Sequence, residues 1–262
     1  MQVQTARERY TACPLCEAPE FVPIVESDCT KHPLYGPEIP PKMQWVGCIR
    51  CGHMFTDGYF TSEVFENLMQ RVQPHSISVE DVEPARVASA AIVDNVANVL
   101  ETLEGRWLDV GFGSGVLLAT ANEFGFETVG VDSCEQSVKD LHGLGYDVRC
   151  QDFQAMEDDK GFDVISMADV LEHMPFPGEA LKRARALMPR GGALFISMPN
   201  TDCLTWKLLD RDGKNPYWSE LEHYHNFGRE HLYWLLERHG FKPCYYAVST
   251  RDRAAMEVIA TC

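Results

Sequence analysis

The strongest constraint on the fold is a regular alternation of short β-prone segments and longer helix-prone segments over residues 105–200. Apolar residues recur with helical spacing in the longer segments, and branched and aliphatic residues dominate the short ones. A chain that alternates in this way forms a mainly parallel sheet with helices on both faces. The predicted strands cover 106–110, 127–131, 147–150, 162–167 and 193–198, and the predicted helices between them cover 115–124, 135–144 and 178–188.

The segments on either side complete this interpretation. A stretch expected to be irregular, 199–227, precedes a helix over 229–239 and two strands over 241–249 and 255–260. We therefore predict that residues 105–262 form an α/β domain, a Rossmann-like three-layer sandwich. Its mixed seven-stranded sheet has its last strand antiparallel.

Residues 61–104 are predicted to form a helical lid or linker. One helix is expected over 61–70, and a second from Pro84 to about Leu103. Proline favours the first turn of a helix, because the N–H that it lacks has no helical partner there.

Residues 1–60 are predicted to form a small zinc-ribbon module. Two of the chain's cysteine pairs have the spacing of zinc knuckles, and four thiolates complete a tetrahedral structural site with no position left open for a substrate. Gly52 follows the second knuckle, where a positive φ is often needed. Unconnected cysteines and a redox dithiol are the alternatives. The predicted zinc ligands are Cys13, Cys16, Cys48 and Cys51.

The charge balance bears on the partners. The chain has 23 Lys and Arg against 39 Asp and Glu, a net charge of −16. Such a surface repels phosphate backbones and anionic membranes, so a small-molecule substrate is expected rather than nucleic acid. No apolar run approaches the length of a membrane span, and the first residues lack the apolar core of a signal peptide. A cytoplasmic location is therefore expected.

A glycine-rich turn stands between the first predicted strand and the first predicted helix of the sheet, where α/β proteins bind cofactors. It reads Leu108-Asp109-Val110-Gly111-Phe112-Gly113-Ser114-Gly115. The dinucleotide pattern would need a further glycine at position 116, which is Val116.

This spacing, with an acid two residues before the first glycine, resembles the first motif of class I S-adenosylmethionine-dependent methyltransferases. The resemblance implies that S-adenosylmethionine is the cofactor, that the glycine turn holds its amino-acid part and that Asp109 orients that part. It also implies that Asp132 binds the ribose hydroxyls, that the end of the third strand lies near the adenine, and that the fourth strand leads to the reactive sulfur. The implied cofactor-binding residues are Asp109, Gly111, Phe112, Gly113, Gly115, Asp132, Ser133, Asp152, Phe153 and Met167.

Transfer to a hydroxyl or amine also needs a base. The segment Glu222-His223-Tyr224-His225-Asn226-Phe227 resembles the Glu-His-x-x-x-Phe segment of zinc-ribbon methyltransferases that act on sugars, which implies that Glu222 and His223 handle the substrate proton. Those relatives have a tyrosine where this chain has Glu220, and they carry an extra C-terminal domain. His225 and His173 are further candidates for the base, and a purely structural role for all three histidines is the alternative. Aromatic and histidine side chains expected to line a substrate cleft are Tyr59, Phe60, His75, Trp206, Tyr217 and Trp218.

The predicted function is methylation of a small polar acceptor, as O-methylation of a sugar or related metabolite with a histidine base. C-methylation of a nucleotide-linked ketosugar and RNA methylation remain alternatives. A different class of protein, a non-catalytic module that binds a partner through its zinc ribbon, also remains open. The sequence does not specify the acceptor, the methylated atom or the oligomeric state.

Overall fold

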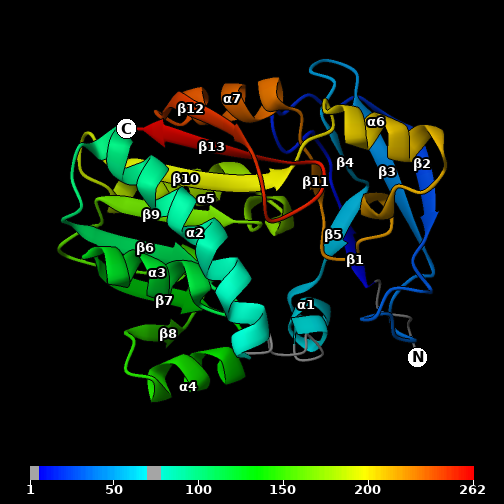
Figure 1. The fold of residues 1–262 in the computed structure, drawn as a ribbon. Helices are drawn as coiled ribbons and strands as arrows, with labels where there is room; N and C mark the ends of the chain where they lie inside the picture. Colours follow the sequence, from blue (N-terminus) through cyan, green and yellow to red (C-terminus); the bar gives the residue numbers. More distant parts are fainter. Residues whose placement is uncertain (1–5, 70–77) are drawn as a thin grey trace.

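A mixed seven-stranded sheet forms the centre of the larger domain in the computed structural model, which describes residues 6–69 and 78–262 (Figure 1). The strand order is β12-β13-β10-β9-β6-β7-β8, and β13 is antiparallel to both of its neighbours. The predicted sheet is confirmed. Its strands are β6 (Arg106–Val110), β7 (Glu127–Asp132), β8 (Val148–Cys150), β9 (Val164–Ala168), β10 (Ala193–Pro199), β12 (Lys242–Val248) and β13 (Ala255–Thr261).

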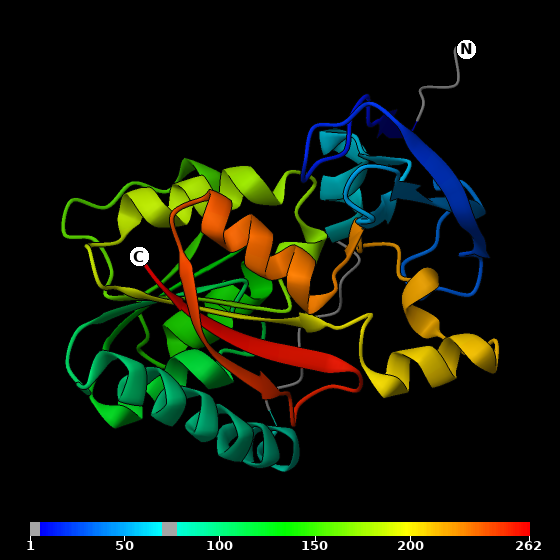
Figure 2. The same ribbon diagram turned by 90° about the horizontal axis from the view of Figure 1, so that it is seen from above.

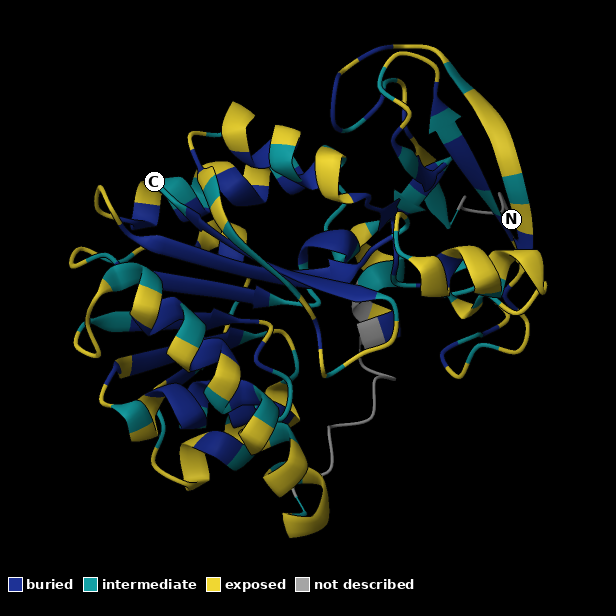
Figure 3. Cartoon of the chain, turned by 45° about the horizontal axis from the view of Figure 1, so that its top comes forward, coloured by how far each residue is buried: buried dark blue, intermediate teal, exposed yellow. Residues whose placement is uncertain are grey.

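Helices cover both faces of this sheet, so the domain has three layers (Figure 2). Successive strand residues point to opposite faces: Trp107 of β6 packs with the core under α2 and α3, and Leu108 packs with the core under α5 and α7. Figure 3 shows the result, with buried central strands and exposed outer helix faces. The helices are α2 (Val79–Leu100), α3 (Val116–Phe124) and α4 (Glu135–Gly143) on one face, and α5 (Pro177–Leu187) and α7 (Arg229–Arg238) on the other.

The N-terminal module lies beyond the carboxyl ends of the parallel strands (Figure 1). Its main sheet has the order β11-β4-β3-β2, and β1 pairs separately with β5. Strand β11 (His225–Asn226) comes from the C-terminal half of the chain, so the sheet is not made by residues 1–60 alone. The division of the chain at residues 60 and 104 stays a prediction. The remaining elements are β1 (Arg7–Arg9), β2 (Phe21–Asp28), β3 (Lys42–Cys48), β4 (Met54–Thr56), β5 (Gly58–Phe60) and α1 (Ser62–Met69).

The segment 199–227 differs from the prediction, because it is not irregular throughout. It contains α6 (Leu204–Arg211), the 3₁₀ turn η3 (Pro216–Trp218) and β11. Helix α6 buries only Trp206, whose ring stacks on that of Tyr217 at 5.1 Å between centroids. Leu204 and Leu208 do have helical spacing in the sequence, but both are exposed in the structure, so the helix adds little to the core.

Helix α2 begins earlier than predicted. The side chain of Ser78 accepts a hydrogen bond from the N–H of Asp81 and caps the helix at Val79. Pro84 therefore lies inside the helix rather than at its first turn, on an exposed surface. Within the described residues, no helix combines the length and the apolar character needed to cross a membrane.

Candidate active site and metal centre

The glycine turn between β6 and α3 depends on backbone conformations that favour glycine. Gly111, Gly113 and Gly115 have φ values of +64°, +56° and +73°. A Cβ atom at Gly111 would lie 2.7 Å from Val170 Cγ2. The turn therefore brings its backbone close to the loop that follows β9.

Asp132, at the end of β7, fastens this turn. Its Oδ2 accepts a hydrogen bond from the N–H of Gly113 at 2.9 Å, and its Oδ1 accepts one from the N–H of Cys134 at 2.8 Å. A carboxylate offers about four lone-pair sites, so acceptor capacity remains for a ligand.

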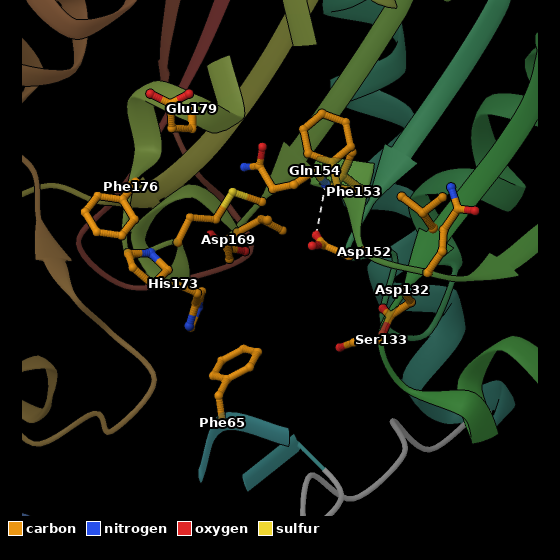
Figure 4. A pocket seen from close by; sticks show the side chains of 17 residues that line it. Phe65, Asp132, Ser133, Asp152, Phe153, Gln154, Asp169, His173, Phe176 and Glu179 are labelled. Atoms are coloured by element: carbon orange, nitrogen blue, oxygen red, sulfur yellow. Dashed lines mark hydrogen bonds between the residues drawn. The ribbon is translucent and has the colours of Figure 1, made fainter. Parts of the chain in front are cut away.

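Two cavities flank the turn at the carboxyl ends of the parallel strands. Cavity A has a volume of about 710 Å³ and cavity B of about 760 Å³. Gly111, Asp169 and His173 line both, so the two spaces share a wall. Figure 4 shows cavity A, with Asp132 and Ser133 on one side, His173 and Phe176 on the other, and Phe65 of α1 reaching in.

Most of the predicted cofactor residues line these cavities. Gly115 and Met167 line neither: Gly115 is the N-cap of α3, and Met167 is buried in β9. Cavity A is lined by Gly111, Asp132, Ser133, Asp152 and Phe153 of the predicted set, and cavity B by Asp109, Gly111, Phe112 and Gly113.

Asp109 is the most perturbed of the cofactor-side acids. Burial raises the pKa of its carboxyl to about 7, although the hydroxyl of Ser166 donates a hydrogen bond to it at 2.6 Å. A carboxyl with this pKa is partly protonated near neutral pH. A cationic group that binds beside it would favour the charged form.

The shared wall contains an ion pair that sequence reasoning missed. Asp169 has a left-handed φ of +57°, and its carboxylate accepts hydrogen bonds from the guanidinium of Arg251 and the hydroxyl of Ser197. Arg251 lies between β12 and β13, in a segment without any motif. Only the fold brings it to cavity B.

The loop before β11 brings two Glu-His pairs together. The N–H of Tyr224 donates to the carbonyl of Glu172 at 2.9 Å, and His173 Nδ1 lies 3.2 Å from the carbonyl oxygen of Glu222. The rings of His173 and His223 are perpendicular, with centroids 4.6 Å apart. Glu222 and His173 line cavity B, whereas His223 lines neither cavity.

His173 has a defined tautomer. A carbonyl oxygen only accepts hydrogen bonds, so the contact with Glu222 places the proton on Nδ1 and leaves Nε2 with a free lone pair. Burial lowers the pKa of His173, which favours the neutral ring. Among the three predicted histidine bases, His173 alone combines a free nitrogen with a place on the cavity wall.

His225 is placed for a structural role. Its Nε2 lies 3.0 Å from the carbonyl of Met174, and its Nδ1 lies 3.1 Å from Nε2 of the buried His53. Burial lowers the pKa of His225 to about 4. With both nitrogens occupied and no place on either cavity, it is not positioned to take a substrate proton.

The carboxylate of Glu222 is held from the N-terminal module by His32, which sequence reasoning did not single out. His32 Nε2 lies 3.0 Å from Glu220 Oε2 and 3.4 Å from Glu222 Oε2. The expected aromatic cleft is not formed around cavities A and B. His75 lies outside the described residues, and the other five, Tyr59, Phe60, Trp206, Tyr217 and Trp218, line neither cavity.

The four predicted zinc ligands converge on one point. Their sulfur atoms all lie within 4.8 Å of one another, with Cys16 and Cys48 at 3.5 Å and Cys13 and Cys51 at 3.8 Å. Four sulfurs about 2.3 Å from a tetrahedral zinc lie roughly 3.8 Å apart, so the group fits this ion. The residue after each knuckle is left-handed, as predicted for Gly52, and the equivalent residue in the first knuckle is Glu17.

Comparison with known proteins identifies the domain that holds the glycine turn and most of the cavity lining. The profile of a family described as "Methyltransferase domain" matches residues 83–245, more than half of the chain. The chain belongs to this methyltransferase family. The matched segment holds the glycine turn, the Glu-His pairs and most of the residues that line the two cavities. This is a class I S-adenosylmethionine-dependent methyltransferase domain.

Individual relatives match over shorter segments. The methyltransferase is 38% identical over 110 residues to a ubiquinone biosynthesis O-methyltransferase of Idiomarina loihiensis, covering 38% of this chain and 45% of that protein. It is 35% identical over 107 residues to the protein of the same description from Coxiella burnetii, covering 38% and 46%. The match thus spans about half the length of these relatives.

Solved structures support the fold. The methyltransferase superposes on Burkholderia thailandensis 1,6-didemethyltoxoflavin-N1-methyltransferase, bound to 1,6-didemethyltoxoflavin and S-adenosylhomocysteine, with a TM-score of 0.59 and 19% identity. That comparison covers 81% of this chain and 96% of the other. For magnesium protoporphyrin IX methyltransferase of Synechocystis, bound to S-adenosylhomocysteine, the TM-score is 0.55 at 20% identity, with coverage of 78% and 96%. At such identities the likeness concerns the fold.

Proposed function

We propose that this methyltransferase transfers the methyl group of S-adenosylmethionine to an oxygen of a small polar acceptor bound in cavity B. The shared wall of Gly111, Asp169 and His173 is the observation that carries the proposal. A cofactor with its nucleoside in cavity A reaches this wall with its sulfonium. The amino-acid part of the cofactor then lies in cavity B beside Asp109 and the glycine turn. An acceptor beside His173 and Glu222 in the same cavity meets the methyl carbon opposite the sulfur, as an in-line displacement requires.

In this proposal the predicted cofactor residues divide by cavity. Asp132 and Ser133 hold the ribose, Asp152 and Phe153 lie against the adenine, and Asp109 with the glycine turn holds the amino-acid part. The cofactor supplies the leaving group, so the protein provides alignment and removal of the acceptor proton.

The acceptor proton leaves on the side of the wall formed by His173 and Glu222, the two catalytic candidates that line cavity B. The geometry thus supports a different histidine base, His173, from the expected His223. Acidic side chains beside this wall, Asp81, Glu222 and Asp252, favour an acceptor rich in hydroxyl groups over an anionic one such as RNA. A sugar or a related metabolite meets this requirement, and the relatives named above as O-methyltransferases support oxygen as the methylated atom.

The cysteine group holds a structural zinc in this proposal. Its four sulfurs are mostly buried and leave no open coordination position. The reduced thiols that such a site needs are consistent with a cytoplasmic protein.

Calorimetry with S-adenosylhomocysteine tests the cofactor part: absence of binding would refute the proposed function. Turnover with sugars and nucleotide-linked sugars tests the acceptor part, and His173→Ala should lower it by on the order of a hundredfold. His142→Ala, at an exposed position on α4, is the matched control and should change little. Unchanged turnover in His173→Ala would remove that residue from the mechanism.

A further inference from the structure

His173 of the shared wall and two side chains behind it form a compact group that the proposed cofactor and zinc sites do not use. Glu172, His173 and His223 each offer a ligand atom, and these atoms all lie within 4.8 Å of one another. Glu172 and His173 belong to the 3₁₀ turn η2 (Leu171–His173), and His223 comes from the loop before β11.

This group is buried and lacks partners. Glu172 is 1% exposed, and neither of its carboxyl oxygens has a hydrogen-bond partner among the described residues. His223 is 8% exposed, and its Nδ1 also has none within that part of the chain. Unpaired buried polar groups are costly, so several in one place indicate a missing partner.

We propose that Glu172, His173 and His223 bind a divalent transition-metal cation, as a second metal site distinct from the four cysteines. Two imidazoles and one carboxylate are the donor set of open, substrate-accessible sites for iron, manganese, cobalt or zinc. A divalent cation supplies what the carboxyl oxygens and the His223 nitrogen lack.

The surrounding hydrogen bonds suit this donor set. The Nδ1–H of His173 donates to the carbonyl of Glu222, which leaves Nε2 for an ion and fixes the ring. Metal-binding histidines usually make such a bond with their second nitrogen. The bond from the Tyr224 N–H to the Glu172 carbonyl keeps the two ligand-bearing segments together.

A second His-carboxylate group nearby, His32 with Glu220 and Glu222, is a weaker candidate. Its members already bond to one another, at 3.0 Å and 3.4 Å, and all three are partly exposed. It therefore has no unmet need for an ion.

The inference rests on the proposed function and changes one role in it: with Nε2 bound to an ion, His173 is a metal ligand rather than the base. Because His173 lines both cavities, an ion beside it would lie where the acceptor oxygen meets the methyl group. Bound to the ion, the acceptor hydroxyl has a lower pKa and loses its proton to water. The oxygen then forms its bond to the methyl carbon as the carbon–sulfur bond breaks, and S-adenosylhomocysteine leaves.

Titration of the zinc-loaded protein with Co²⁺ tests the site without an acceptor. We expect one further equivalent of Co²⁺ to bind, with the weak absorption of nitrogen and oxygen ligands and without an intense sulfur-to-cobalt band. Glu172→Gln should weaken this binding by more than about a hundredfold, and Glu220→Gln should leave it unchanged. His223→Gln is the second variant in case Glu172→Gln does not fold, as judged by its melting temperature and S-adenosylhomocysteine binding.

Each other outcome overturns the inference. No further equivalent, or one with a sulfur-to-cobalt band, would show that the cysteines alone bind metal. Loss of the equivalent in Glu220→Gln but not in Glu172→Gln would assign the ion to the His32 group. If S-adenosylhomocysteine binds in all these cases, the proposed methyl transfer stands, and only the second metal site is refuted.

Discussion

The cofactor side and the acceptor side of this methyltransferase are built from different kinds of sequence. The cofactor side uses strand ends that follow one another along the chain: Asp109 is next to last in β6, Asp132 ends β7, and Asp152 follows β8. The acceptor side assembles His32 from the N-terminal module, His173 from the middle of the chain and Arg251 from its end. A binding site made from consecutive elements leaves a motif in the sequence, whereas one made by tertiary packing does not.

The largest expected effect is the loss of acceptor turnover, with cofactor binding retained, when the zinc site is removed. Cys48→Ser should remove the metal and unfold the module, because structural zinc sites supply much of the folding free energy of small modules. Since β11 pairs with β4, the loop bearing Glu222 should lose its support, and acceptor turnover should fall below detection. Calorimetry should still detect S-adenosylhomocysteine, within about tenfold of the wild-type affinity.

Cys150→Ser, at an exposed cysteine outside the module, is the control and should bind metal normally. Loss of cofactor binding together with turnover in Cys48→Ser would show that the two sides do not fold independently.

Asp109 on the cofactor side and His225 in β11, beside the loop of the acceptor side, should also change the stability with pH in opposite directions. Burial raises the pKa of Asp109 from 3.8 to about 7, so between these values the folded protein without cofactor holds more protons than the unfolded chain. The free energy of unfolding then falls as pH rises through that window. Burial lowers the pKa of His225 from 6.5 to about 4, so its contribution is present above pH 6.5 and is lost as pH falls toward 4.

Each effect is limited to roughly 3–4 kcal/mol. Urea unfolding at a series of pH values measures both effects. Asp109→Asn should reduce the fall in unfolding free energy as pH rises from about 4 to 7. His225→Gln should reduce the fall in unfolding free energy as pH drops from 6.5 toward 4. Saturating S-adenosylhomocysteine should also reduce the fall in unfolding free energy with rising pH, because its ammonium group favours the charged carboxylate of Asp109. If Asp109→Asn leaves the fall in unfolding free energy with rising pH unchanged, its assignment to Asp109 is wrong.

A smaller effect is expected for the ribose contact. Asp132→Ala should weaken S-adenosylhomocysteine binding by about 10- to 100-fold, which is what loss of one or two hydrogen bonds to a charged group costs. Asp147→Ala removes the same charge from an exposed position near the start of β8 and should have little effect on calorimetric affinity. Equal losses in the two variants would indicate a general charge effect rather than a ribose contact.

The smallest effect compares one glycine from each side. Gly115 and Gly52 both have a left-handed φ, but a Cβ at Gly115 would also lie 2.1 Å from Leu141 Cδ1, whereas at Gly52 the nearest atom is 3.7 Å away. Gly115→Ala should therefore cost about 2 kcal/mol of unfolding free energy, and Gly52→Ala about 1 kcal/mol. Chemical denaturation measures both values. A larger loss of unfolding free energy in Gly52→Ala than in Gly115→Ala would mean that the packing around Gly115 adjusts to an added methyl group.

The same contrast explains how much could be predicted from sequence. The strands of the central sheet and the four convergent cysteines could be predicted, since apolar periodicity and knuckle spacing are local properties. Helix α6 was missed although Leu204 and Leu208 have helical spacing, because it has only eight residues and buries only Trp206. The choice between His173 and His223 depends on which ring faces a cavity, and that depends on the contact between Glu172 and Tyr224, which are distant in sequence.

The pairing of β11 with β4 also limits how such a protein can be recombined. The module's sheet takes strands from both halves of the chain, so exchanging residues 1–60 alone would place a foreign strand beside the native β11. A graft meant to carry a new acceptor preference therefore has to transfer residues 200–227 with the module. Residues 1–60 and 200–227 therefore have to be exchanged together, although about half of the chain lies between them.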